Sequence, residues 1–137
     1  SWPNKSALLF GEEVYSADSH TQYDLIFMPS FEIEKIGQDT VDLFINKNSL
    51  GEMTREAADN FVNHIADASK LFFHMNIENN ANLYSDGTLG PLASDYPVPK
   101  ERFRLLFRYP DIGHLLAQGY LDFRQDIFVY LYEKKAA

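Results

Sequence analysis

The sequence contains no cysteine, which excludes a disulfide framework and thiolate metal ligands. It also lacks an apolar run long enough to span a bilayer, and no basic and then apolar signal segment opens it. Basic residues are scarce, since 12 Lys and Arg stand against 20 Asp and Glu, a net charge of −8. An acidic surface repels phosphate groups, so neither nucleic acid nor a membrane is expected as a partner. We expect a cytoplasmic protein that acts on a small molecule.

Apolar side chains, in contrast, are plentiful. Of the 137 residues, 45% are hydrophobic and 15% are aromatic, which is enough to bury a sizeable core. The length suits one ordinary domain and is too short for two. We therefore expect a single domain over residues 1–137.

Two apolar segments flank an amphipathic helix. Val41–Asn46 predicts a strand, and its continuous apolar character indicates burial on both faces. Apolar residues then recur at helical spacing after a plausible N-cap, Thr54: Ala58, Phe61, Val62, Ile65 and Ala68. Leu71–Ile77 is typical of another buried strand. Strand, helix and strand with short joints form a βαβ unit, so the two strands are expected to be parallel.

Further strands are predicted on both sides of this unit. Ala7–Phe10 and Tyr23–Met28 are short apolar segments, and Pro29 ends the second. Phe103–Tyr109 and Ile127–Tyr132 are expected to pair antiparallel, because their connection leaves little room for a crossover helix. That connection holds a short helix or turn at 113–120.

The segment from Glu78 to Pro99 has no helical or strand periodicity and is rich in Asn, Gly and Pro. Loops of this length are uncommon in compact domains and tend to be lids or binding loops. We expect a lid here.

Polar residues gather at the ends of both strands of the βαβ unit: Asn46, Asn48, Ser49 and Glu52 after the first, and Asn76, Glu78, Asn79 and Asn80 after the second. Ligands of open α/β sheets bind at the carboxyl ends of the strands. Glu52 and Glu78 are the candidates for a general base. Two structural alternatives remain open: Ser49 and Glu52 can form a capping box, and the Asn-rich turn can satisfy its own backbone.

The histidines and the arginines of the predicted strands give little evidence for a functional site. The four histidines, His20, His64, His74 and His114, show no metal-ligand spacing, and no metal site is expected. Arg104 and Arg108 alternate with apolar residues, which is typical of a solvated strand face.

The segment from Tyr23 to Asn80 resembles the carboxyl-terminal half of class I S-adenosylmethionine-dependent methyltransferases, and more narrowly the sugar O-methyltransferases. The resemblance is carried by the run Val41-Asp-Leu-Phe-Ile-Asn-Lys-Asn-Ser-Leu-Gly-Glu-Met-Thr54, the helix after it, and Phe72-Phe-His-Met-Asn76. It implies an α/β fold with a partial Rossmann-like, mostly parallel sheet and a final antiparallel pair. It also implies that S-adenosylmethionine and a sugar are the ligands of a full-length relative.

The resemblance assigns roles to the polar residues. Asn46, Asn48 and Ser49 would face the cofactor, and Asn76, Asn79 and Asn80 the substrate, while Glu52 and Glu78 would be catalytic. The family binds its cofactor mainly through a Gly-rich turn after the first strand of the fold. This sequence has no Gly-x-Gly and begins with Ser1. We therefore expect a truncated domain that neither binds the cofactor nor acts on its own.

The family's strand order, 3-2-1-4-5-7-6, has a further implication. This chain would supply a contiguous 4-5-7-6 block, with Val41–Asn46 as an apolar edge. Because such an edge is a template for pairing, we expect Ala7–Phe10 or Tyr23–Met28 to pair beside it, or two chains to form a homodimer through it.

Two other functions are compatible with the sequence. A non-catalytic α/β interaction module would expose an aromatic patch on Phe128, Tyr130 and Tyr132. An unrelated α/β enzyme would use Glu52 or Glu78 as a base with a perturbed pKa.

Overall fold

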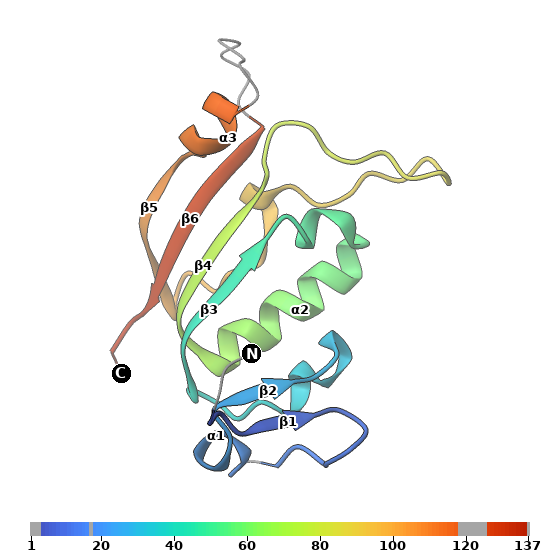
Figure 1. The fold of residues 1–137 in the computed structure, drawn as a ribbon. Coiled ribbons are helices and arrows are strands. Elements are labelled where there is room, and N and C mark those ends of the chain that lie inside the picture. The colour runs from blue at the N-terminus through green and yellow to red at the C-terminus, as the bar shows by residue number, and fades with distance from the viewer. Residues whose placement is uncertain (1–3, 17, 118–125, 137) are drawn as a thin grey trace.

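The computed structural model describes residues 4–16, 18–117 and 126–136 (Figure 1). Its elements, with η for a 3-10 helix, are β1 (Ala7–Leu9), α1 (Ser19–Gln22), β2 (Leu25–Phe27), η1 (Ser30–Lys35), β3 (Val41–Lys47), η2 (Leu50–Glu52), α2 (Arg55–Ala68), β4 (Ser69–Ile77), η3 (Ala93–Asp95), β5 (Phe103–Pro110), α3 (Ile112–Ala117) and β6 (Ile127–Lys134). The protein is thus a mixed α/β fold. Part of the short helix predicted over 113–120 lies outside the described residues.

The strands form two sheets. β1 and β2 pair in parallel, and a four-stranded sheet has the order β3-β4-β6-β5. β3 and β4 are parallel and joined through α2, whereas β6 is antiparallel to both of its neighbours. The predicted βαβ unit and the predicted antiparallel pairing of the last two strands are both confirmed.

Helix α2 covers one face of the four-stranded sheet (Figure 1). It begins at the predicted cap, where Thr54 Oγ1 accepts a hydrogen bond from the backbone N–H of Ala57 at 3.3 Å. Its buried side chains include Val62 and Ile65, which pack in one cluster with Phe72 of β4. Each fully buried aliphatic side chain contributes about 1.5–3 kcal/mol through removal of apolar area from water. This burial fixes α2 against the sheet.

The predicted lid from Glu78 to Pro99 runs on the same side of the sheet as α2. It contains only one short helix, η3, and an isolated bridge between Leu83 and Leu89. Tyr96 and Val98 of this segment join the core cluster that α2 forms. The end of the segment that leads into β5 is therefore packed onto the sheet.

The face of the sheet opposite α2 carries a row of apolar side chains. In register across the four strands, this row consists of Ile45, Phe73, Leu131 and Phe107. Ile45 is 62% exposed and Phe107 is 37% exposed. The prediction that β3 is covered on both faces is therefore wrong for the part of the chain that the structure describes: α2 covers one face, and no described helix covers the other.

The prediction that Ala7–Phe10 or Tyr23–Met28 pairs beside β3 is also wrong. β1 and β2 pair with each other, and among the described residues β3 has a neighbour on one side only. The physical reason is local, because Asp24 binds the start of β1: its Oδ2 accepts from the N–H of Ser6 at 3.0 Å, and its Oδ1 pairs with Lys5. These contacts fix β2 alongside β1.

Candidate functional site

A row of polar side chains crosses the four-stranded sheet on the α2 face. In register across the strands, it consists of Asn46, His74, Tyr130 and Arg108. Asn46 is 7% exposed, His74 is 0% and Tyr130 is 3%. Burying polar groups costs free energy unless they are hydrogen-bonded. The sheet thus buries three of these polar side chains on the α2 face and leaves Ile45 and Phe107 exposed on the other, which marks the polar row as a candidate site.

A chain of amides links the ends of β3 and β4. Asn76 Nδ2 donates to Asn46 Oδ1 at 3.0 Å, and Asn46 Nδ2 donates to Ser49 Oγ at 2.6 Å. Asn76 is completely buried, yet its Oδ1 has no hydrogen-bond partner among the described residues. The capping box left open as an alternative for Ser49 and Glu52 does not form, because the Ser49 hydroxyl binds Asn46 and makes no capping hydrogen bond.

A cavity of about 170 Å³ lies at the carboxyl ends of these two strands, lined by Asn48, Gly51, Glu52, Asn76, Ile77 and Ile127. The turn that forms it depends on Asn48, whose backbone adopts the left-handed region at φ 49° and whose N–H donates to Met75 O at 2.8 Å. Asn tolerates that conformation better than most residues. The structure therefore brings together Asn48, Glu52 and Asn76, one residue from each of the three predicted roles.

Glu52 lies at this cavity with an exposed side chain. Its Oε1 accepts a hydrogen bond from Asn82 Nδ2 at 3.1 Å, and the same amide nitrogen donates to Gly51 O at 2.9 Å. Together with Asn76 Oδ1, these groups are hydrogen-bond acceptors. A ligand that carries O–H or N–H donors complements them.

Glu78 has a different environment. Its side chain is 9% exposed and forms an ion pair with Arg108, whose Nε lies 3.1 Å from both carboxylate oxygens. The Tyr130 hydroxyl also donates to this carboxylate, and burial followed by that hydrogen bond raises the pKa of Tyr130. Arg108 is exposed, as expected for a solvated strand face, and its guanidinium also stacks over the Phe128 ring at 4.2 Å. Because Glu78 is engaged in this way, Glu52 is the better placed of the two carboxylates predicted as candidate bases.

The remaining predicted substrate residues lie outside the lining of the cavity. Asn79 and Asn80 are both exposed, and Asn80 Nδ2 donates to Asp126 Oδ1 at 2.5 Å. This contact ties the start of the lid segment to the residue before β6. The structure thus gives Asn80 an anchoring contact.

His74 is the most deeply buried group of the polar row. Its ring stacks on Tyr130 at 4.6 Å between centroids and lies 5.2 Å from the ring of Tyr96. Neither ring nitrogen has a hydrogen-bond partner among the described residues, and neither does the Tyr96 hydroxyl. Burial lowers the pKa of His74 to about 3, so the ring is neutral at physiological pH. His74 is therefore a core residue.

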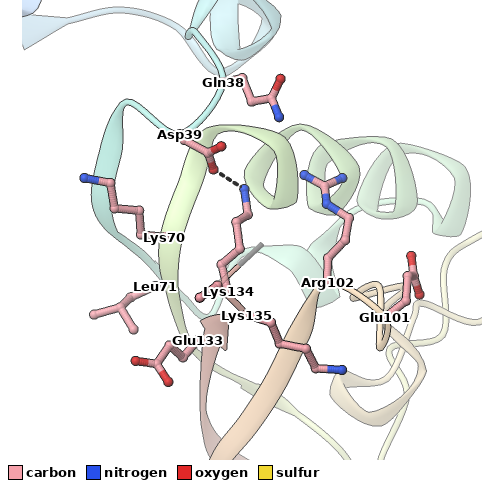
Figure 2. Close-up of a pocket in the computed structure, with 10 residues that line it drawn as sticks. Gln38, Asp39, Lys70, Leu71, Glu101, Arg102, Glu133, Lys134 and Lys135 are labelled. Carbon is pink, nitrogen blue, oxygen red and sulfur yellow. Dashed lines mark hydrogen bonds and ion pairs between the residues drawn. The ribbon is translucent and has the colours of Figure 1, made fainter.

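A second hollow, of about 640 Å³, lies at the opposite end of the sheet (Figure 2). There Lys134 pairs with Asp39, and its ammonium also donates to Asp67 O at 3.1 Å. Arg102 donates to Ala66 O at 2.9 Å. These cations bind carbonyls in the last turn of α2, where positive charge stabilises a helix end. The hollow thus has a structural explanation and lies at the amino ends of β3 and β4.

Two classes of site are not found in the part of the chain that the structure describes. No group of three or more His, Asp or Glu side chains is arranged to hold a metal ion. No helix there has the length and apolar character that crossing a membrane requires.

The fold and the site define a mixed α/β protein with a small cavity, lined by both polar and apolar residues, at the carboxyl ends of two parallel strands. No known family model and no curated protein matches the chain.

Proposed function

We propose that the chain is the carboxyl-terminal part of a class I methyltransferase-type domain, and that the complete domain transfers a methyl group from S-adenosylmethionine to a sugar hydroxyl in the cytoplasm. One observation carries this proposal. The sheet has the order β3-β4-β6-β5, with β6 antiparallel to both neighbours. That order corresponds to the 4-5-7-6 block and the final antiparallel pair of the family that the sequence resembles.

The residues of this chain do not fit the cofactor on their own. Two of the three predicted cofactor contacts, Asn46 and Ser49, bind each other, and both polar atoms of the Asn46 amide are hydrogen-bonded. The chain also has no Gly-x-Gly turn to hold the cofactor's amino-acid and ribose parts. We therefore place the cofactor site in a Gly-rich half beyond this chain.

The methyl acceptor, a sugar hydroxyl, fits the residues of the cavity better than the cofactor does. A sugar hydroxyl placed there can donate to Glu52, whose carboxylate would take its proton as a general base. Asn76 Oδ1 offers a second acceptor for a neighbouring hydroxyl. Asn48 closes the cavity from the side of β3.

Two measurements test the proposal. Calorimetry with S-adenosylmethionine should give no binding to this chain alone, and micromolar binding would contradict the division into halves. The complete product of the encoding reading frame should include a strand and a Gly-rich turn upstream. It should also transfer labelled methyl groups to a sugar, with a loss of about 10²–10⁴-fold in Glu52→Gln, the range of general-base catalysis.

A second candidate is a non-catalytic interaction module. The exposed apolar row on the open face of the sheet favours it, since contiguous apolar patches mark interaction sites. The aromatic patch expected for such a module is wrong, because Tyr130 is buried and Phe128 and Tyr132 are half-buried on the α2 side. If the complete gene product transfers no methyl group to a sugar, that result would favour the interaction module.

A further inference from the structure

The segment from Asn79 to Pro99 is fastened to the turn at the cavity by a small set of contacts. Asn82 Nδ2 donates to Gly51 O and to Glu52 Oε1. The Tyr84 hydroxyl lies 2.5 Å from Met53 O and 3.2 Å from Gly51 O. We call these contacts of Asn82 and Tyr84 with residues 51–53 the latch.

Gly90 allows the latch to close. Its N–H donates to Asn82 O at 2.7 Å, which folds the segment back on itself. A Cβ atom at this position would lie 2.9 Å from Gly51 O and 2.9 Å from the Tyr84 hydroxyl oxygen, closer than real Cβ contacts. Only glycine therefore permits the approach.

Beyond the latch, the tip of the segment has little packing. Leu83, which lies between Asn82 and Tyr84, forms an isolated bridge with Leu89, and these two residues are 71% and 61% exposed. In Figure 1 this part of the chain projects away from the sheet and α2. Segments with few buried apolar contacts open at low free-energy cost.

Buried polar atoms with no hydrogen-bond partner among the described residues lie at the base of the segment and in the strand before it. These are Asn76 Oδ1, both ring nitrogens of His74 and the Tyr96 hydroxyl. Buried groups of this kind are rare in native proteins and often mark functional positions. Asn76 lines the cavity at which the latch closes.

We propose that residues 79–92 are a latched lid, and that the Asn82 amide occupies the place of a ligand at Glu52 and Gly51. One amide nitrogen with two N–H groups donates to two neighbouring acceptors, so a ligand with two adjacent O–H groups matches it. The ligand class is therefore a vicinal diol, whose two hydroxyls displace Asn82 and donate to Glu52 and Gly51 O in its place. The assignment of the diol as a methyl acceptor rests on the proposed function, whereas the latch does not.

Hydrogen exchange tests the latch without any ligand. Tyr84→Phe removes the hydroxyl contacts, so amide exchange over 82–92 should rise about tenfold, the equivalent of roughly one hydrogen bond. Exchange in α2 and β4 should stay unchanged. Ser85→Ala, an exposed position in the same segment, is the matched control and should leave exchange as in the parent. Unchanged exchange in Tyr84→Phe, or an equal rise throughout the protein, would overturn the latch.

A pair of small probes tests the ligand class. cis-1,2-Cyclohexanediol should shift the amide resonances of residues 48–53 and 76, and cyclohexanol, with one hydroxyl, should not. Asn82→Ala should bind the diol several-fold more tightly, because no amide competes for Glu52. Equal binding by Asn82→Ala and the parent, or no diol binding by either, would overturn the displacement. Both experiments keep their meaning if the complete gene product transfers no methyl group.

Discussion

Asn76 donates its side-chain amide to Asn46 Oδ1 at 3.0 Å, which joins the carboxyl ends of two parallel strands. Both side chains are buried, at 0% and 7% exposed. Apolar residues of similar size at these positions would avoid the cost of burying amides. The pair is therefore explained by what it does for the cavity: it fixes the Asn76 amide with Nδ2 on Asn46, while Oδ1 has no hydrogen-bond partner in the part of the chain that the structure describes.

Replacing one of the two asparagines, Asn46 or Asn76, should lower the free energy of unfolding more than replacing both. Asn46→Leu leaves Asn76 Nδ2 buried without its acceptor, so the free energy of unfolding should fall by about 1–3 kcal/mol. The double variant Asn46→Leu, Asn76→Leu should recover most of that loss. Urea unfolding of the two single variants and the double variant gives the coupling. A double variant no more stable than Asn46→Leu would show that the amide pair is not the source of the cost.

His74 should make the protein sensitive to acid. Burial lowers the pKa of His74 from 6.5 to about 3, so below pH 6.5 the unfolded chain binds a proton that the folded protein does not. This contribution to stability is complete above pH 6.5 and is lost as the pH falls towards 3. Its slope should approach about 1.4 kcal/mol per pH unit.

His74→Phe isolates this contribution. The variant should be more stable than the parent at pH 7, because the phenyl ring fills the aromatic stack without unpartnered nitrogens, and its stability should change less between pH 6.5 and 4. His20→Gln, at an exposed position, is the control. Parallel stability curves for His74→Phe and the parent would contradict the lowered pKa.

Local periodicity was sufficient to predict the elements of the large sheet. The helix after Thr54, the strand at Leu71–Ile77 and the antiparallel final pair all follow from spacing and connection length. Periodicity describes one segment at a time, so it could not show that Arg108 reaches Glu78 from another strand. The only sequence feature that pointed to this contact was the presence of Arg108 among apolar residues.

Continuous apolar character was the misleading signal. Leu43 and Ile45 alternate with Phe44 and Asn46, and a strand with apolar residues on both sides reads as buried on both sides. The sequence cannot specify which surface covers each side. The contacts of Asp24 with Lys5 and Ser6, which lie beside the paired strands β1 and β2, also have no counterpart in the hydrophobic pattern of the sequence.

Arg102 should contribute more to stability than Arg104, although each forms one ion pair. Arg102 binds Asp67 and also Ala66 O in the last turn of α2, whereas Arg104 binds Glu133 on an exposed strand face. Exposed ion pairs contribute little, typically below 1 kcal/mol. Arg102→Ala should therefore lower the free energy of unfolding by about 1–2 kcal/mol, and Arg104→Ala by about 0.5 kcal/mol or less. Equal losses in thermal or urea unfolding would contradict a role at the helix end.

The free edge of β3 should pair with a second copy of the chain. Among the described residues β3 has one neighbour, and Leu43 and Ile45 beside its edge are 45% and 62% exposed. An apolar strand edge presents unpaired backbone groups that a second strand can satisfy. Sedimentation at tens of micromolar should give a dimer. Ile45→Lys should give a monomer, because the charge would enter the joined apolar face. Leu105→Lys, at an exposed position on the opposite edge strand, should remain dimeric. A parent protein that sediments as a monomer, or equal dissociation in both variants, would contradict pairing at this edge.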